Sequence, residues 1–300
     1  MSLRLEMLQV ARLAPAVLGP EATELIDAYV KAQQNPDGGF RDRDGESDLY
    51  YTSFAIDVLT SLQVEPPFES LGGYLDEKRS DLTEMDFVHL CCLARLYSAL
   101  PETEQTAERA VAPVLAAIET YRSADGGYNQ IEEADTGSAY ACFLAYGAYA
   151  DHGQSLPDSE GVIRCLDSLA TADGAWANDT LFPVPNVPST AAAITVLRNL
   201  RQPIPENTAN WLLGSFHLTG NGGGFLPFPS APIPDLLSTA VALHALDGLQ
   251  VPFEKMKEPL LDFIDTLWTA EGGFHGTWDD DDLDIEYTYY GLLALGHLAL

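Results

Sequence analysis

The sequence predicts an all-α fold in which six helical hairpins close into an α/α toroid, with one ring of inner helices and one of outer helices. A Gly-Gly-aromatic signature recurs along the 300 residues at 38–40, 126–128, 223–225 and 272–274, with a degenerate copy at 173–176. From residue 126 onward the copies are roughly 49 residues apart, which indicates a repeat architecture. The first interval is about two periods long, so one copy has lost its signature and six units fit the chain.

Each unit combines two kinds of apolar run. The runs at 52–59 and 238–246, which follow Gly turns, are apolar on nearly every side and predict helices buried all round. The run at 254–267 carries charges at intervals and predicts a helix with only one buried face. Inner and outer helices therefore alternate along the chain.

The elements follow in this order along a single domain, 1–300, whose residues 1–20 form an N-terminal extension helix. The expected outer and inner helices pair as 21–34 with 48–63, 67–78 with 82–100, 105–122 with 136–151, 158–170 with 188–200, 205–216 with 236–249, and 254–268 with 285–299. Prolines separate units at Pro101, Pro157, Pro203 and Pro252. The out-of-phase Gly-Gly-Tyr at 72–74 is expected inside a helix. The first and last inner helices are as apolar as the others, which favours a closed ring over an open solenoid, with a central cavity at the inner-helix N-termini.

The charge balance restricts the partners. Against 45 Asp and Glu stand 15 Lys and Arg, a net charge of −30, which excludes a nucleic-acid binder and disfavours anionic lipid surfaces. Adaptation to high salt would give the same composition. No apolar run approaches the ~18 residues of a membrane span, so we expect no membrane insertion. The four cysteines lack CxxC spacing and are expected as reduced thiols in the cytoplasm.

Three inner-helix starts carry a family resemblance. The segments 48–52 (Asp-Leu-Tyr-Tyr-Thr), 133–140 and 284–288 (Asp-Ile-Glu-Tyr-Thr) resemble those of protein prenyltransferase β subunits and, more distantly, of squalene-hopene cyclases and related terpene cyclases. The resemblance spans all six units. It implies a prenyltransferase/terpenoid cyclase-like toroid whose cavity takes an isoprenoid.

The resemblance also implies a catalytic zinc, which the prenyltransferases hold with an Asp-x-Cys and a His. The matching positions here are Asp235, Leu237 and Tyr287. A lone carboxylate does not hold zinc, so we expect no zinc site of the standard type. Asp235 is kept as a candidate catalytic residue, with a helix N-cap after Pro234 as the alternative.

The basic residues that bind diphosphate in that family are missing as well. Gly137 and Asn186 stand near the positions of an Arg and a His. Arg41 and Arg43, in the loop of the first unit, either reach inward or form a solvated pair. The resemblance implies a helical-repeat partner subunit, whose basic residues would supply the missing charge.

The last inner-helix start offers acid chemistry. The class II terpene cyclases use an Asp-x-Asp-Asp-Thr pattern, and the segment in register carries two carboxyls, Asp284 and Glu286, as candidate proton donor and orienting group. The adjacent aspartates suggest Mg²⁺ at Asp280, Asp282 and Asp284, since Mg²⁺ prefers oxygen ligands. A solvated acidic run is the alternative.

Aromatic residues dominate the expected cavity. The candidate ligand-binding residues are Tyr50, Tyr51, Tyr140, Tyr287 and Tyr289. Most of them stand on the first and last inner helices, which become neighbours when the ring closes. Their rings suit an isoprenoid chain and a carbocation. The aromatics of the Gly turns are expected in repeat packing, and His89 and His244 inside the core.

Four functions follow from these observations. The first is a divergent prenyltransferase-β-like protein that binds an isoprenoid with an incomplete zinc triad, and would be a transferase if active. The second is a class II terpene cyclase-like enzyme. The third is a non-catalytic binding or scaffold protein on the same toroid. A glycosidase is a distant fourth, because Asp and Glu are too plentiful to single out a pair.

Overall fold

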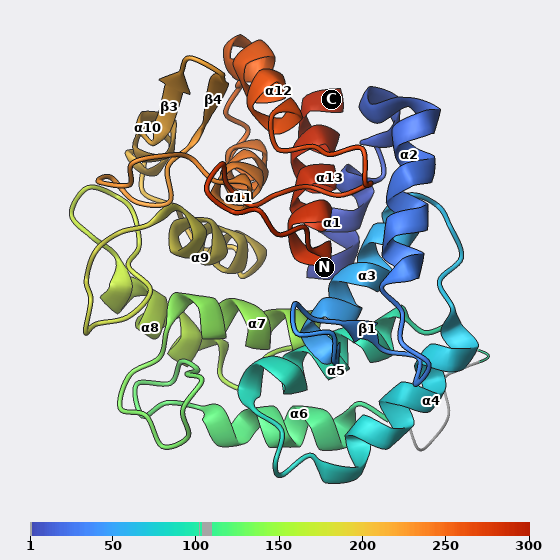
Figure 1. Cartoon of the computed structure of the whole chain (residues 1–300). Coiled ribbons are helices and arrows are strands. Elements are labelled where there is room, and N and C mark those ends of the chain that lie inside the picture. The colour runs from blue at the N-terminus through green and yellow to red at the C-terminus, as the bar shows by residue number, and fades with distance from the viewer. Residues whose placement is uncertain (1, 102, 104–109) are drawn as a thin grey trace.

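The inner ring forms because six apolar helices each begin at a side-chain cap and then pack against their neighbours. The computed structural model describes residues 2–101, 103 and 110–300, and Figure 1 shows the helices arranged around a central axis. The inner helices are α3 (Leu49–Ser61), α5 (Phe87–Ala99), α7 (Ala139–Ala150), α9 (Val187–Asn199), α11 (Leu236–Gly248) and α13 (Ile285–Ala299). Each contacts the next, and α13 contacts α3, so the ring is closed.

The outer helices precede their inner partners in the chain. They are α2 (Pro15–Ala32), α4 (Phe68–Lys78), α6 (Ala112–Ile118), α8 (Ser159–Leu169), α10 (Thr208–Gly214) and α12 (Lys257–Asp265). The predicted α/α toroid of six pairs is confirmed, and residues 72–74 lie inside α4 as expected. Part of the expected helix 105–122 lies outside the described residues. Short 3-10 turns extend three of the connections: η1 (Arg79–Asp81), η4 (Glu119–Tyr121) and η5 (Glu254–Met256).

Two small antiparallel hairpins were not predicted. They are β1 (Phe40–Arg41) with β2 (Ser47–Asp48), and β3 (Phe216–Thr219) with β4 (Gly222–Phe225). Strand β3 ends the outer helix of its unit early, so α10 is shorter than the expected 205–216.

The Gly signature has a packing reason. Gly38 has φ +98, and a Cβ there would lie 2.2 Å from the carbonyl oxygen of Ser70 on the next outer helix. The following aromatic, Phe40, donates its backbone N–H to Thr52 Oγ1 at 2.9 Å on the adjacent inner helix. The same bond joins later turns to Thr190, Thr239 and Thr288. The repeated Gly and Thr therefore fix each turn to its inner helix.

The N-terminal segment differs from the expected single extension helix at 1–20. Helix α1 (Leu3–Ala11) ends before Pro15, where α2 begins. Helix α1 lies at the end of the ring formed by the C-terminal halves of the inner helices and contacts α3, α7 and α13. The approach is close: a Cβ on Gly296 would lie 2.2 Å from the Val10 carbonyl oxygen. No helix of the described part has the length and apolar character needed to cross a membrane.

Candidate functional site

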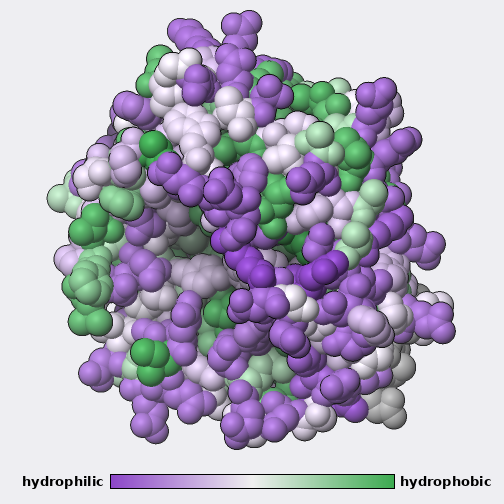
Figure 2. Space-filling view, viewed as in Figure 1, coloured by the Kyte–Doolittle hydropathy of each residue, from purple (hydrophilic) through white to green (hydrophobic). Residues whose placement is uncertain are grey.

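A central cavity lies between the inner helices and consists of two chambers of about 100 and 200 Å³. Figure 2, viewed as in Figure 1, shows a hollow near the middle of the molecular surface. The chambers share Met7, Tyr50, Tyr140, Phe143, Val241 and Tyr290. Their combined volume is at the lower end of the ~300–1,000 Å³ of ligand pockets. The shared lining is almost entirely apolar or aromatic, which suits an apolar ligand.

The lining side chains recur along each inner helix. On α7 they are Tyr140, Phe143, Leu144 and Gly147, and on α3 Tyr50, Ser53 and Phe54. Spacings of three, four and seven residues place side chains on one helical face. These intervals therefore identify the residues on the inward face of the ring.

Glu286 lines neither chamber but is hydrogen-bonded to Tyr50, which lines both. It lies in the first turn of α13, one turn before Tyr290, which lines both chambers. Tyr50 Oη donates a hydrogen bond to Glu286 Oε1 at 2.7 Å. Burial raises the pKa of Glu286 to about 7, and Asp284 adds to the rise, while Tyr50 and Arg43 oppose it. A carboxyl with this pKa is partly protonated at neutral pH and can act as an acid.

Asp284, the other predicted carboxyl, is committed to structural bonds. Its Oδ1 caps α13 by accepting from the Tyr287 backbone N–H at 2.8 Å. Its Oδ2 accepts from Arg43 Nη2 at 2.7 Å and Nε at 3.0 Å. Burial raises the pKa of Asp284, and the bonds from Tyr287 and Arg43 lower it. Among the described contacts, Glu286 accepts one side-chain hydrogen bond, on Oε1, whereas both Asp284 oxygens accept bonds.

The positions that match a zinc triad do not fit zinc. Asp235 caps α11 and accepts from Ser238 N at 2.6 Å and Ser238 Oγ at 2.8 Å, and burial raises its pKa. Leu237 lines the larger chamber, and the Tyr287 ring lies 5.8 Å from the Arg43 guanidinium. This set offers one carboxylate and neither thiolate nor imidazole, so Asp235 is an N-cap in this structure.

Arg43 occupies the place where Mg²⁺ was expected. Its guanidinium lies 3.0 Å from Asp280, 3.8 Å from Asp282 and 2.7 Å from Asp284. Within residues 2–101, 103 and 110–300, no three His, Cys, Asp or Glu side chains are grouped closely enough to hold a metal ion. The three aspartates thus have no preformed magnesium site. Arg41 instead donates to the Ala32 carbonyl.

The tyrosine predictions divide into two groups. Tyr50 and Tyr140 line both chambers and Tyr289 lines the smaller one, whereas Tyr51 and Tyr287 line neither. Tyr290, a further aromatic expected in the cavity, lines both chambers, whereas Phe54 and Phe143 were not predicted. Their spacing of four residues from Tyr50 and three from Tyr140 is the signal that would have found them.

His89 is not the core residue that was expected. It stands in the first turn of α5, with Nε2 2.7 Å from Asp48 Oδ2 and Nδ1 2.6 Å from Asp86 Oδ2. These two carboxylates raise the pKa of His89 to about 9, against the effect of burial. The side chain is therefore an imidazolium at neutral pH and links the caps of α3 and α5. His244 is buried as expected.

Solved structures with the same fold cover nearly the whole chain. The type II terpene cyclase MstE from Scytonema, in complex with merosterolic acid A, matches with a TM-score of 0.64 at 15% identity over 96% of both chains. An alpha-1,6-mannanase of Salegentibacter, in complex with alpha-1,6-mannotriose, matches with a TM-score of 0.63 at 14% identity over 93% of this chain and 98% of that one.

A protein from Actinoplanes matches with a TM-score of 0.64 at 16% identity, over 93% of this chain and 99% of that chain. No curated protein matches the sequence. The family model of the prenyltransferase alpha-alpha toroid domain matches residues 21–91 and 190–299, which is more than half of the chain. The chain therefore belongs to the prenyltransferase alpha-alpha toroid family.

Proposed function

We propose that the protein binds an isoprenoid in its central cavity and uses Glu286 as the acid that starts cyclisation, in the manner of the class II terpene cyclases. The observation that carries this proposal is the environment of the Glu286 carboxyl. This carboxyl accepts a hydrogen bond from Tyr50, which lines both chambers of an aromatic cavity, and burial raises its pKa to about 7. A protonated carboxyl in such surroundings is the kind of group that protonates an alkene.

The proposed reaction balances without a redox partner. The Glu286 proton forms a C–H bond with a terminal alkene carbon, using the π electrons, and leaves a tertiary cation. A second alkene attacks this cation and forms the ring C–C bond. A proton then passes from the carbon beside the final cation to solvent water, and its C–H electrons form the product alkene, so the net change is an isomerisation. Glu286 regains a proton from solvent before the next cycle, and the faces of Tyr50, Tyr140 and Tyr290 stabilise the cations.

The similarity to MstE supports this proposal. That protein is a type II terpene cyclase with a structure in complex with geranylgeranyl dihydroxybenzoate as substrate, and it aligns with this chain over 97% of both lengths at 14% identity. An isoprenoid substrate is thus held there by a chain of this fold and similar extent.

The other functions have less support. A zinc-dependent prenyl transfer lacks ligands at Leu237 and Tyr287, and Gly137 and Asn186 offer no charge to a diphosphate. Nothing in the described contacts supports a partner subunit. A glycosidase needs polar groups for sugar hydroxyls, whereas the shared lining here is mostly apolar. The four buried free cysteines suit the reducing cytoplasm that the sequence predicts.

The test is turnover in deuterated water. Purified protein is incubated at pH 6 with isoprenoids of increasing chain length, and products are identified by mass spectrometry. We expect a cyclic isomer that carries deuterium at the protonated carbon, and a loss of at least about 10²-fold in Glu286→Gln. The matched control is Glu271→Gln, an exposed glutamate near the start of the same unit's loop. Unchanged turnover in Glu286→Gln would contradict the proposal. If the wild type and the variants bind isoprenoids but none of them shows turnover, the non-catalytic toroid is favoured.

A further inference from the structure

Two charged side chains, Arg95 and Asp151, line the smaller chamber. Arg95, on α5, lines the smaller chamber together with Tyr50. Its side chain lies deep in the ring and still keeps 22% of its surface accessible. A guanidinium that is surrounded by protein and accessible on the chamber side has a donor available to a ligand.

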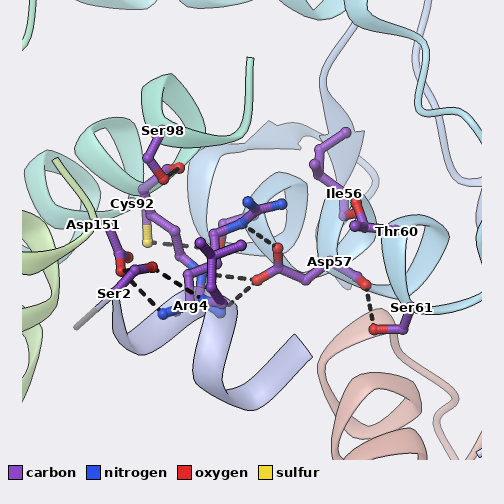
Figure 3. A network of polar contacts seen from close by, with 12 residues as sticks. Ser2, Arg4, Ile56, Asp57, Thr60, Ser61, Cys92, Ser98 and Asp151 are labelled. Carbon is purple, nitrogen blue, oxygen red and sulfur yellow. Dashed lines mark hydrogen bonds and ion pairs between the residues drawn. The ribbon is translucent and has the colours of Figure 1, made fainter. Parts of the chain in front are cut away.

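The local pairing leaves this guanidinium only partly satisfied. Arg95 Nε donates to Asp57 Oδ2 at 2.8 Å, Arg95 Nη2 donates to the same oxygen, and Arg4 Nε donates to Asp57 Oδ1 at 2.6 Å. A guanidinium has five N–H donors, so Asp57 takes two of those of Arg95. Figure 3 shows the Arg4 and Asp57 side chains pointing toward one another. The Asp57 side chain is 1% exposed, so one buried carboxylate serves two arginines. Arg95 therefore shares its counter-ion with Arg4.

A second carboxylate, Asp151, also lines the smaller chamber, and its charge raises the pKa of Arg95. Asp151 Oδ1 accepts from Ser2 Oγ at 2.7 Å and from the Arg4 backbone N–H at 3.0 Å, so this carboxylate is engaged by α1. The buried Tyr289 hydroxyl lies beside Arg95, whose guanidinium opposes the rise that burial causes in the pKa of that hydroxyl. The N–H groups of Arg95 that Asp57 does not take are the donors that this end of the chamber offers to a ligand.

The depth of the chamber sets the size of a ligand that spans it. Asp57 follows Tyr50 by seven residues on α3, which is about 10 Å along the helix. Tyr50 contacts Glu286 at one end and Asp57 contacts Arg95 at the other. An apolar chain with an oxygen acceptor at one end matches this length and polarity.

We propose that Arg95 forms a head-group subsite for the carboxylate of an isoprenoid acid, which places the alkene tail beside Glu286. This proposal rests on the proposed function, because it assigns the head group of the same ligand. A guanidinium is suited to a carboxylate, since hydrogen bonds between ionised groups are the strong ones. The tail orientation also places the terminal alkene, rather than the polar end, next to the acid.

The test compares two ligands with the same chain, geranic acid and geraniol, by calorimetric titration of the full-length protein at pH 7.5. We expect geranic acid to bind at least about tenfold more tightly than geraniol. Arg95→Gln removes this preference. The matched control is Arg4→Gln, which removes the other guanidinium from Asp57 but does not line the smaller chamber, and it keeps the preference.

Two further variants separate the possible failures. Arg95→Lys keeps a cation next to Asp57 and should retain most of the preference for the acid, which provides a folded variant if Arg95→Gln does not fold. Glu286→Gln should lose turnover and keep the preference. Equal binding of both ligands by the wild type, or an unchanged preference in Arg95→Gln, would overturn the subsite while leaving the cavity proposal intact. If neither ligand binds, both proposals fail.

Discussion

The two ends of the inner ring hold their charges in opposite ways. At the end where the helices begin, carboxylates cap the backbone: Asp48, Asp86, Asp235 and Asp284 each accept an N–H from their own helix. At the other end, Arg4 and Arg95 converge on Asp57 beneath α1. Carboxylates are favourable at helix N-termini. Glu286 is the exception, because it lies among these caps without capping a helix, and burial then favours its protonated form.

The largest expected effect concerns the end closed by α1. Asp57→Ala leaves two guanidinium groups without their shared carboxylate, so we expect a loss of about 3–5 kcal/mol in the free energy of unfolding. Urea denaturation measures it. The control is Asp27→Ala, which removes the i,i+4 pair with Lys31 and should cost no more than about 0.5 kcal/mol. A loss in Asp57→Ala as small as that of the control would show that the two ends do not differ.

The opposite end should respond to pH through Glu286. Its pKa is raised from 4.5 to about 7, so the native state holds an extra proton between these values and stability falls as pH rises through this window. Glu286→Gln resembles the protonated form. The variant should match the wild type near pH 4.5 and exceed it by about 3 kcal/mol at pH 8. Thermal unfolding of both proteins across this range measures the difference, and parallel curves would contradict it.

The contribution of His89 to the free energy of unfolding should also fall as pH rises, but at a higher pH. Its pKa is raised from 6.5 to about 9 by Asp48 and Asp86, so its contribution is complete below pH 6.5 and lost as pH rises through about 9. Because the side chain is 33% exposed, the contribution is expected to be only about 1 kcal/mol. His89→Gln should therefore be less stable than the wild type at pH 6 and equal to it at pH 10. Urea unfolding at both values checks this, and a difference that persists at pH 10 would indicate lost packing.

The smallest effect is expected at Arg43. Its side chain is 40% exposed, so Arg43→Gln should cost less than about 1 kcal/mol, and less still at high salt. The variant also frees Asp280, Asp282 and Asp284. Millimolar Mg²⁺ should then raise the melting temperature of Arg43→Gln and leave the wild type unchanged. Equal stabilisation of both proteins would show that Mg²⁺ binds elsewhere.

The ring was predictable because its causes lie close together in the sequence. Gly38 and Thr52 stand in one unit, and the pattern they set recurs in later units. The distinction between Asp284 and Glu286 was not predictable. It depends on which carboxyl meets the Tyr287 N–H and on Arg43, which is 241 residues away.

The closure of one end of the ring by α1 was not predictable either. Its side chains find partners on α3, α7 and α9, as Arg4 does with Asp57, Ser2 with Asp151 and Glu6 with Arg198. Such pairs leave no local signal, because each partner alone is an ordinary polar residue near the end of an apolar helix. The sequence therefore indicated an extension helix and not its place in the ring.

The most direct test of the central claim is the titration of the Glu286 carboxyl itself. Infrared difference spectra between the wild type and Glu286→Gln, recorded from pH 4 to pH 9, follow its protonated carbonyl band. The structure predicts a midpoint at about 7, so the acid remains partly protonated where the reaction is proposed to start. A midpoint near the ordinary value of 4.5 would leave Glu286 ionised at neutral pH and contradict its role as the acid.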